Sequence, residues 1–218
     1  MNKNNLKSLI KPMLLCLCLT ATGAWASVFH TDIIVAGGST SGVTAALQAS
    51  RSGAKVTVVE PTTWLGGMLT AAGVGAVDGN YNMPAGLWGE FRDSLAVHYG
   101  GLDALKTGWV SNVMFEPSVG NRIFHNMVSK ENGITLWEKS EIKSVRHDDG
   151  GWTVAVERGP GKVDTLKARI LIDATELGDI ARMCGVAYDT GMESRNVTHE
   201  DIAPLQANNI VQDLTYVA

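Results

Sequence analysis

Residues 32–60 constrain the fold of this chain more than any other stretch. An apolar run at 33–36 meets a turn at Gly37 and Gly38, small residues follow, and a second apolar run ends at Glu60. A strand, a tight turn, a helix and a second strand in this order form a βαβ unit. The helix N-terminus that follows such a turn offers N–H groups and a partial positive charge to a diphosphate. The stretch therefore predicts a dinucleotide-binding unit, with strands at 32–36 and 55–60 and a helix at 41–52.

Single positions in this unit have separate roles. Gly37 lets the chain turn sharply after the first strand, and Gly42 lets the helix lie close against the strands. Glu60 ends the second strand, where a carboxylate can accept hydrogen bonds from ribose hydroxyls and would repel the 2′-phosphate of NADP. Ser39 stands where G-x-G-x-x-G has its middle glycine. Its Cβ adds bulk beside the diphosphate, which Gly38 can offset, and its hydroxyl can itself bond a phosphate. The alternative is a βαβ turn without a ligand.

The first 26 residues have the pattern of a secretory signal peptide. A lysine-containing start precedes a short apolar core at 13–19, and Ala24-Trp25-Ala26 forms a small-x-small cleavage site. We expect cleavage after Ala26 and export of a bacterial protein to the periplasm or the medium. The apolar core is too short to span a bilayer stably, so no stable membrane anchor is expected. The alternative is a cytoplasmic leader that stays attached.

Cleavage would leave Cys184 as the one cysteine, because Cys16 and Cys18 lie in the leader. One thiol cannot form an intrachain disulfide or hold an iron–sulfur cluster. We expect Cys184 to be a buried, small apolar residue rather than a redox thiol. The histidines show no metal-ligand spacing, so no metal site is predicted. The net charge of −4 does not support nucleic-acid binding.

The rest of the pattern departs from an NAD-binding domain. Residues 64–133 separate the second and third strands and contain two helical stripes but no strong strand. A β-meander replaces the next crossover helix, which favours an FAD-binding domain over an NAD-binding domain. The predicted elements are helices around 87–99 and 117–128, strands at 134–138, 141–147, 152–157, 164–168 and 169–173, and a helix at 177–184.

Four segments resemble FAD-dependent oxidoreductases of the two-dinucleotide-binding type, most of all their exported bacterial members. The segments span residues 35–42, 59–70, 115–119 and 172–193. The resemblance implies an α/β fold: a Rossmann-like FAD-binding domain with a parallel sheet, a helical insertion and an antiparallel three-stranded β-meander. We expect a signal peptide at 1–26, the FAD-binding domain at 27–185 with its insertion at 64–133 and meander at 141–168, and the start of a truncated substrate domain at 186–218.

The same resemblance implies an FAD site. The loop at 65–68 would pass under the flavin and the ribityl chain, where its glycines allow close backbone approach. The strand end at 173–175 would close over the nucleotide, and the main chain of Ile142 would meet the adenine. The cofactor-binding residues implied in this way, or by the βαβ unit, are Gly37, Gly38, Ser39, Thr40, Ser41, Gly42, Glu60, Pro61, Gly66, Gly67, Met68, Ile142, Ala174, Thr175, Gly178 and Asp179.

Two departures from the family pattern affect this expectation. The usual Ala-Thr-Gly is Ala-Thr-Glu here, so Glu176 brings a carboxylate near the site. Members of the family also continue into a substrate domain and a C-terminal segment that completes the flavin site, so we expect the chain to need such a segment beyond Ala218. The expected function is transfer of a hydride from a small organic substrate to FAD, without assigned catalytic residues. The alternatives are a non-catalytic nucleotide-binding or accessory protein, and an NAD-binding domain.

Overall fold

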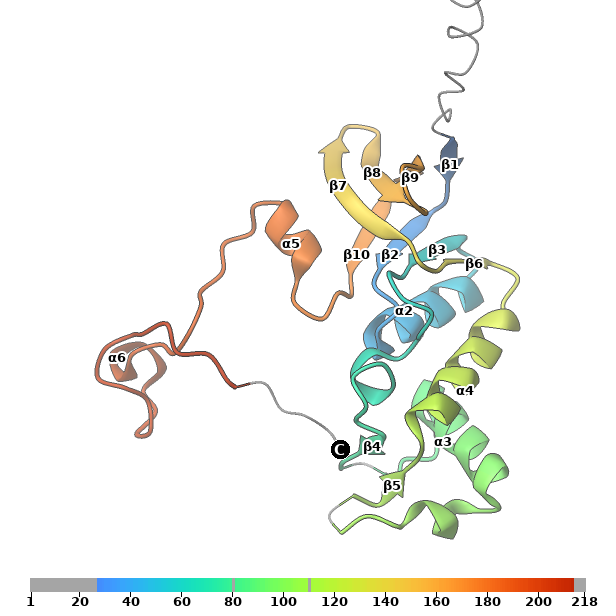
Figure 1. Cartoon of the computed structure of the whole chain (residues 1–218), viewed down its shortest axis with the longest axis vertical. Helices are drawn as coiled ribbons and strands as arrows, with labels where there is room; N and C mark the ends of the chain where they lie inside the picture. Colours follow the sequence, from blue (N-terminus) through green and yellow to red (C-terminus); the bar gives the residue numbers. More distant parts are fainter. Residues whose placement is uncertain (1–26, 80, 110, 214–218) are drawn as a thin grey trace, which may run out of the picture.

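The structure is a computed structural model that describes residues 27–79, 81–109 and 111–213. The predicted signal peptide at 1–26, with Cys16 and Cys18, therefore lies outside the described residues, as do residues 214–218. The described part is built around two four-stranded sheets, with helices on the outer face of one of them (Figure 1). Among the described residues, no helix is both long enough and apolar enough to cross a membrane.

The central sheet is parallel throughout and has the order β10-β2-β3-β6. Its strands are β2 (Ile33–Ala36), β3 (Val56–Val59), β6 (Ile134–Trp137) and β10 (Ile170–Asp173). Side chains alternate between the two faces of a strand, and both faces are covered here. Ile34 and Ala36 face the second sheet, whereas Val35 faces the helices. Burial on both faces explains the continuous apolar run that predicted these strands.

Three helices belong to the outer layer: α2 (Thr40–Arg51), α3 (Gly86–Tyr99) and α4 (Pro117–Ser129). The helical stripes predicted from the sequence form the core between them. Phe91 of α3 stacks on Phe124 of α4 with 4.5 Å between ring centroids, and both rings are buried. Pro117 occupies the first turn of α4, where its missing N–H leaves no bond unmade. The predicted helices in the insertion are thus confirmed.

The second sheet contains the predicted meander and one strand that the sequence did not reveal. The antiparallel strands β7 (Glu141–Asp148), β8 (Gly151–Glu157) and β9 (Val163–Ala168) follow the predicted bounds closely. The added strand, β1 (Val28–His30), pairs in parallel with β9. Val154, Val156 and Leu166 of this sheet pack on the central sheet. The parallel sheet, helices and meander confirm the predicted α/β class.

Several local predictions need correction. The insertion contains a small antiparallel pair, β4 (Ala76–Val77) with β5 (Val113–Met114), beside the 3-10 turns η1 (Gly67–Leu69) and η2 (Leu102–Leu105). These strands are too short to produce an alternating pattern. The helix predicted at 177–184 is the shorter α5 (Asp179–Met183), since Gly178 has a positive φ of 69°.

The chain beyond α5 extends away from the two sheets (Figure 1) and contains the short helix α6 (Arg195–Thr198). The prediction that Cys184 is buried is wrong, because its side chain is exposed. Cys184 follows the last residue of α5, and Ile180 is the one residue of this helix that is buried. The assignment of residues 186–218 to a second domain stays a prediction.

Candidate functional site

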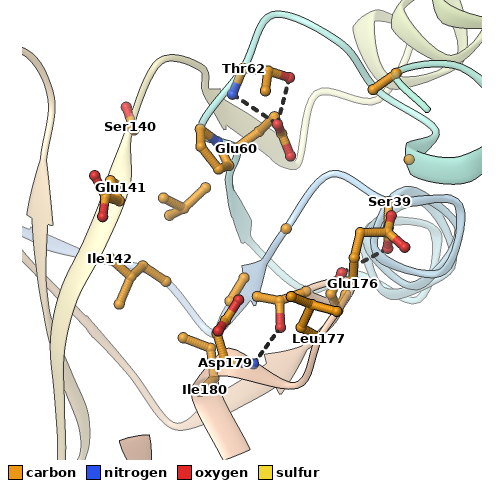
Figure 2. Close-up of a pocket in the computed structure, with 18 of the residues that line it drawn as sticks. Ser39, Glu60, Thr62, Ser140, Glu141, Ile142, Glu176, Leu177, Asp179 and Ile180 are labelled. Atoms are coloured by element: carbon orange, nitrogen blue, oxygen red, sulfur yellow. Dashed lines mark hydrogen bonds between the residues drawn. The ribbon is translucent and has the colours of Figure 1, made fainter. Parts of the chain in front are cut away.

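A pocket of about 480 Å³ opens at the carboxyl ends of the central strands β2, β3 and β10. This edge is where open α/β sheets bind their ligands. The volume lies within the range of about 300–1,000 Å³ that is typical of small-molecule sites. Figure 2 shows its wall, which comes from the turn after β2, the end of β3, the start of β7 and the turn after β10.

The glycine turn after β2 is packed too tightly for side chains. Gly37 has a φ of +95°, and a Cβ there would lie 2.5 Å from the carbonyl oxygen of Ala174. A Cβ on Gly42 would overlap the carbonyl oxygen of Gly37 and lie 3.0 Å from the Cβ of Ala174. The turn, helix α2 and the end of β10 therefore approach one another closely, as the sequence predicted for Gly37 and Gly42.

Gly38 joins this turn to the end of β3. Its amide donates a hydrogen bond of 2.7 Å to Oε2 of Glu60, and a Cβ on it would lie 2.6 Å from Leu65. The glycine turn and the acidic end of β3 are thus in direct contact. The sequence predicts that these two places hold the diphosphate and the ribose of one nucleotide.

Ser39 caps helix α2 where the family pattern has a glycine. Its Oγ accepts a hydrogen bond from the Gly42 amide at 3.2 Å and donates one to the carbonyl of Ala174 at 2.8 Å. The Oγ of Ser41 lies 2.9 Å away and acts as the donor in that contact, since the Ser39 proton is already used. Serine is a preferred cap residue. A phosphate bond from Ser39, as the sequence suggested, would compete with Ala174.

Glu60 is buried but keeps room for one more partner. Its Oε2 accepts from Gly38, and its Oε1 accepts from the amide and the hydroxyl of Thr62 at 2.8 and 2.6 Å. A carboxylate has about four lone-pair positions. These three bonds leave one position, on a side chain that lines the pocket.

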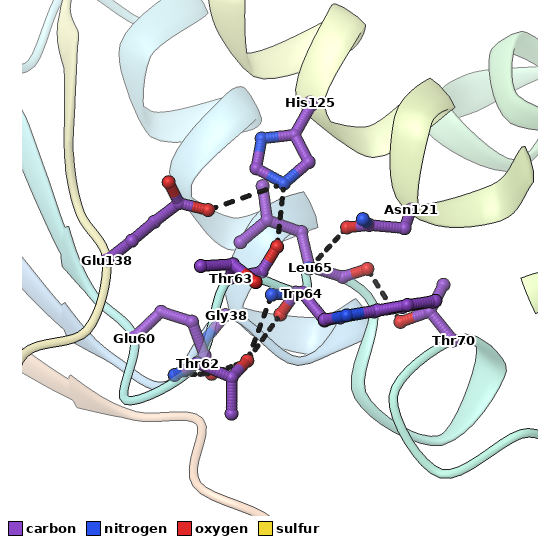
Figure 3. A network of polar contacts seen from close by, with 10 residues as sticks. All are labelled: Gly38, Glu60, Thr62, Thr63, Trp64, Leu65, Thr70, Asn121, His125 and Glu138. Atoms are coloured by element: carbon purple, nitrogen blue, oxygen red, sulfur yellow. Dashed lines mark hydrogen bonds and ion pairs between the residues drawn. The ribbon is translucent and has the colours of Figure 1, made fainter. Parts of the chain in front are cut away.

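The loop at 65–70 is fixed to both the glycine turn and helix α4. Gly66 donates its amide to the Gly38 carbonyl at 2.7 Å, and its own carbonyl accepts the Thr40 hydroxyl at 2.7 Å. Figure 3 shows the other anchors: the Leu65 amide donates to Asn121 Oδ1 at 2.8 Å, and the Thr70 hydroxyl donates to the Leu65 carbonyl. Gly66 and Gly67 both have positive φ, which only glycine adopts freely.

Asp173 organises the turn between β10 and α5. Its carboxylate accepts from the amide and the hydroxyl of Thr175 and from the Ala181 amide, at 2.7–3.0 Å. The Thr175 hydroxyl in turn accepts the Asp179 amide at 2.8 Å. Burial acts to raise the pKa of Asp173, but the hydrogen bonds from Thr175 and Ala181 outweigh it and hold the pKa below its ordinary value. Asp173 thus stabilises the turn that forms one wall of the pocket.

The predicted cofactor residues fall into two groups. Those that line the pocket are Gly37, Ser39, Glu60, Pro61, Gly67, Ile142, Ala174, Thr175 and Asp179. Six more predicted residues are not among the lining residues: Gly38, Thr40, Ser41, Gly42, Gly66 and Gly178. Met68 is 61% exposed and is not among the lining residues.

The lining also contains residues that the sequence did not single out as binding residues. These are Ala36, Val59, Thr62, Trp64, Ala71, Ser140, Glu141, Leu177, Ile180, Arg182 and Met183. Thr62 lies two residues after Glu60, the acidic strand end, and this position was the one signal in the sequence that could have identified it. Glu141 and Arg182 come from β7 and α5, whose approach to the glycine turn depends on long-range packing.

Glu176 places its carboxylate directly against Gly67 and Ser39, at the N-terminal end of α2. Figure 2 shows its side chain beside Ser39. The residue is exposed, so the side chain is free to turn toward solvent. Together with Glu60, Glu141 and Asp179 it gives the pocket lining four acidic side chains, against one basic side chain, Arg182.

The residues present fit a nucleotide. Ribose hydroxyls need acceptors, which Glu60 provides, and a diphosphate needs donors. The Ser41 amide, in the exposed first turn of α2, has no acceptor assigned among the described residues. Within the same described ranges, no three His, Cys, Asp or Glu side chains lie close enough to hold a metal ion.

Comparison with known proteins gives a family and a set of structures with a similar fold. A family model described as FAD dependent oxidoreductase matches residues 32–217. The OxyS anhydrotetracycline hydroxylase from Streptomyces rimosus is 15% identical over 77% of this chain and 36% of that chain, with a TM-score of 0.57. The p-nitrophenol 4-monooxygenase PnpA from Pseudomonas putida DLL-E4 is 16% identical over 77% and 45%, with a TM-score of 0.54.

The flavin-dependent monooxygenase PieE, solved with FAD and substrate, is 18% identical over 77% of this chain and 34% of that chain, with a TM-score of 0.56. At these identities the likeness concerns the fold. The chain spans less than half the length of each of these three proteins.

Proposed function

Because the chain belongs to the FAD-dependent oxidoreductase family, whose cofactor is FAD, we propose that the pocket at the strand ends binds the adenosine diphosphate part of FAD. The observation that carries this proposal is the contact between the glycine turn and the acidic strand end, the 2.7 Å bond from Gly38 to Glu60. This contact brings a hydroxyl acceptor and the N-terminus of α2 to one pocket, as a nucleotide requires.

Each wall of the pocket has a role in the proposed complex. The free lone pair of Glu60 accepts a ribose hydroxyl, and the first turn of α2 holds the diphosphate with its amides. Ile142, at the start of β7, lies on the adenine side. The loop at 65–68, fixed by its bonds to the glycine turn, supports the ribityl chain.

The proposed reaction is removal of a hydride from a small organic substrate. Bound FAD supplies the electron-accepting ring, and the residues described above bind and orient it. The two-dinucleotide-domain organisation, and a further segment that completes the flavin site, belong to the same proposal. So does export: we assign residues 1–26 to a cleaved signal peptide and the protein to the periplasm or the medium.

Titration of the purified full chain with FAD tests this function, with flavin fluorescence quenching as the readout and NAD as the competitor. Wild-type protein is expected to bind FAD in preference to NAD. In Glu60→Gln, the amide NH₂ faces other donors and the charge is lost, which weakens binding about tenfold or more. Glu193→Gln, at an exposed position outside the pocket, is the control and should bind as wild type does. Equal FAD affinity in all three proteins would contradict the proposal.

A further inference from the structure

Ser27, the first residue after the predicted cleavage site, contacts a fully buried carboxylate. Its backbone nitrogen donates a hydrogen bond of 3.1 Å to Oδ1 of Asp164 in β9, and Asp164 is 0% exposed. The Ser27 carbonyl accepts the Thr165 amide at 2.8 Å, which continues the pairing of β1 with β9. The position of this nitrogen is therefore set by the sheet, independently of the carboxylate.

The other groups around Asp164 lie on its second oxygen. Nη1 of Arg158 is 3.4 Å and Nζ of Lys162 is 3.9 Å from Oδ2. The Arg158 guanidinium also lies over the Trp137 ring, 4.0 Å from its centre. Strands β1 and β9 contain two further titratable side chains, His30 and Lys167. These two residues lie opposite each other in the strand register, at the end of β1 that is farthest from Ser27. Among the described residues, the hydrogen-bond partner of Oδ1 is the Ser27 nitrogen alone.

We propose that cleavage between Ala26 and Ser27 turns this hydrogen bond into an ion pair between an ammonium group at the exposed Ser27 and the buried Asp164 carboxylate, which holds β1 on β9 in the processed protein. The inference rests on the export proposed above. In the cleavage, water adds across the peptide bond, Ala26 leaves with a carboxylate on the leader, and the Ser27 nitrogen takes up protons to become an ammonium group. No oxidant, reductant or further co-reactant is needed.

Processing stabilises the fold for a simple electrostatic reason. The hydrogen bond from the Ser27 amide already has one charged partner, the Asp164 carboxylate. An ammonium group at the same place adds the attraction between two opposite full charges, which is stronger beside a buried carboxylate than in bulk water. Asp164 is buried whether its partner is an amide or an ammonium group, so cleavage adds attraction without a further loss of carboxylate hydration. An N-terminus one residue longer would place its charge beyond Asp164 and leave an amide at Ser27.

Two chains that differ by one residue test the ion pair: one beginning at Ser27 and one beginning at Ala26, each released from a fusion by a protease that leaves no extra residue. The full 218-residue chain serves as the unprocessed form. Urea unfolding near neutral pH should show an unfolding equilibrium constant about tenfold smaller for the chain that begins at Ser27. Equal constants for the two shorter chains would overturn the proposal.

Substitution of the carboxylate provides the matched control. Asp164→Asn keeps an oxygen acceptor but removes the charge, so the difference between the two chains should disappear. Asp149→Asn, at the exposed tip of the β7–β8 hairpin, should leave the difference unchanged. A difference that persists in Asp164→Asn contradicts the ion pair.

A titration of the α-amine by NMR gives a readout that does not depend on the folding of the Asp164 variant. The ordinary pKa of an α-amino group is about 7.7–8.0. Since Asp164 stabilises the charged form, the pKa in the folded chain should be higher. The stabilisation should be complete below pH about 8 and be lost as the pH rises through the folded-state pKa. A folded-state pKa at or below the ordinary value would overturn the proposal.

Mass spectrometry of the protein recovered from exporting cells tests the cleavage step itself. An N-terminus at Ser27 supports it, and any other N-terminus overturns it. None of these measurements involves FAD, so a failure of the ion pair and a failure of the proposed FAD site would be told apart.

Discussion

Gly42 shows how one atom can decide the geometry of this site. A methyl group there would overlap the Gly37 carbonyl and push α2 away from the glycine turn. We expect Gly42→Ala to cost about 1–3 kcal/mol of folding free energy, the usual cost of overpacking, and to weaken FAD binding at least tenfold. Urea unfolding and FAD titration would measure both effects.

Gly150→Ala is the matched control for this substitution. Gly150 lies at a hairpin tip, where a Cβ would meet only the end of the Asp148 side chain, at 3.2 Å. Its stability should stay within about 0.5 kcal/mol of wild type. If Gly42→Ala were as stable as Gly150→Ala and bound FAD equally well, the close approach of α2 would not be required.

Glu176 has the opposite expected effect. Its carboxylate lies against Gly67 and Ser39, next to the helix N-terminus where we place the diphosphate. Glu176→Gln removes a like charge from that place, so FAD affinity should rise about two- to fivefold, as expected for an exposed charge. The gain should shrink at high salt. Glu193→Gln again serves as the control, and an unchanged or weaker affinity in Glu176→Gln would contradict the placement.

At the scale of elements, the order of strands and helices follows from local patterns, whereas the side-chain contacts that hold these elements together do not. Arg51 at the end of α2 donates two bonds to Glu90 of α3, at 2.6 and 2.9 Å, and one of 2.7 Å to Glu131, just beyond α4. The hydrogen bonds from Arg51 lower the pKa of Glu90, and those to Glu90 and Glu131 raise the pKa of Arg51. One side chain thus joins three helical segments.

Arg51→Gln should therefore cost up to about 1 kcal/mol at neutral pH, because these side chains are partly exposed and screened. A carboxylate with a lowered pKa stabilises the fold above its unfolded-state pKa and loses that contribution as the pH falls through its folded-state pKa. The difference from wild type should accordingly be largest near neutrality and vanish in acid. Chemical unfolding at several pH values measures it.

Arg146→Gln is the reference substitution. It breaks a single exposed pair, with 3.3 Å between Arg146 and Asp148, and should change stability by less than about 0.5 kcal/mol. If Arg51→Gln lowered the stability by the same amount from neutral to acidic pH, the charges of Glu90 and Glu131 would not contribute to the stabilisation that Arg51 provides.

At the scale of the whole molecule, the sheets and the segment after α5 are held very differently. The strand pairs β2–β3 and β2–β10 lie within a core that is apolar on both faces. Among the described residues, the hydrogen bonds that involve residues 187–213 stay within that segment, such as the pair between Met192 and Asn208. Large apolar side chains there, among them Ile202, Leu205 and Ile210, are exposed.

Hydrogen exchange should reveal this division. Amides of β2, β3 and β10 are expected to exchange only through global unfolding, whereas those of residues 187–213 should exchange faster by several orders of magnitude. Mass-spectrometric exchange on the full chain measures both regions in one sample. Equal protection in the two regions would mean that the segment is held by contacts beyond those described.

Local pattern was sufficient for most of the secondary structure. The bounds of β3, α4 and the meander strands could be read from periodicity and turn residues, because strands buried on both faces and helices with one buried face leave regular apolar spacings. β1 was missed because its three residues are exposed and are held by pairing with β9, distant in sequence. Cys184 was misplaced because its burial depends on which distant elements pack on α5, and of this helix only Ile180 is buried.

What the sequence by itself determined is the βαβ unit, the acidic strand end, the insertion and the meander, since each depends on residues that are neighbours along the chain. Only the tertiary structure decided that Ser39 caps α2 and bonds Ala174, that Glu176 lies against Gly67 and that Ser27 meets Asp164. These contacts join residues more than 100 positions apart in the chain, and no local spacing encodes which distant side chains the folded sheets bring together.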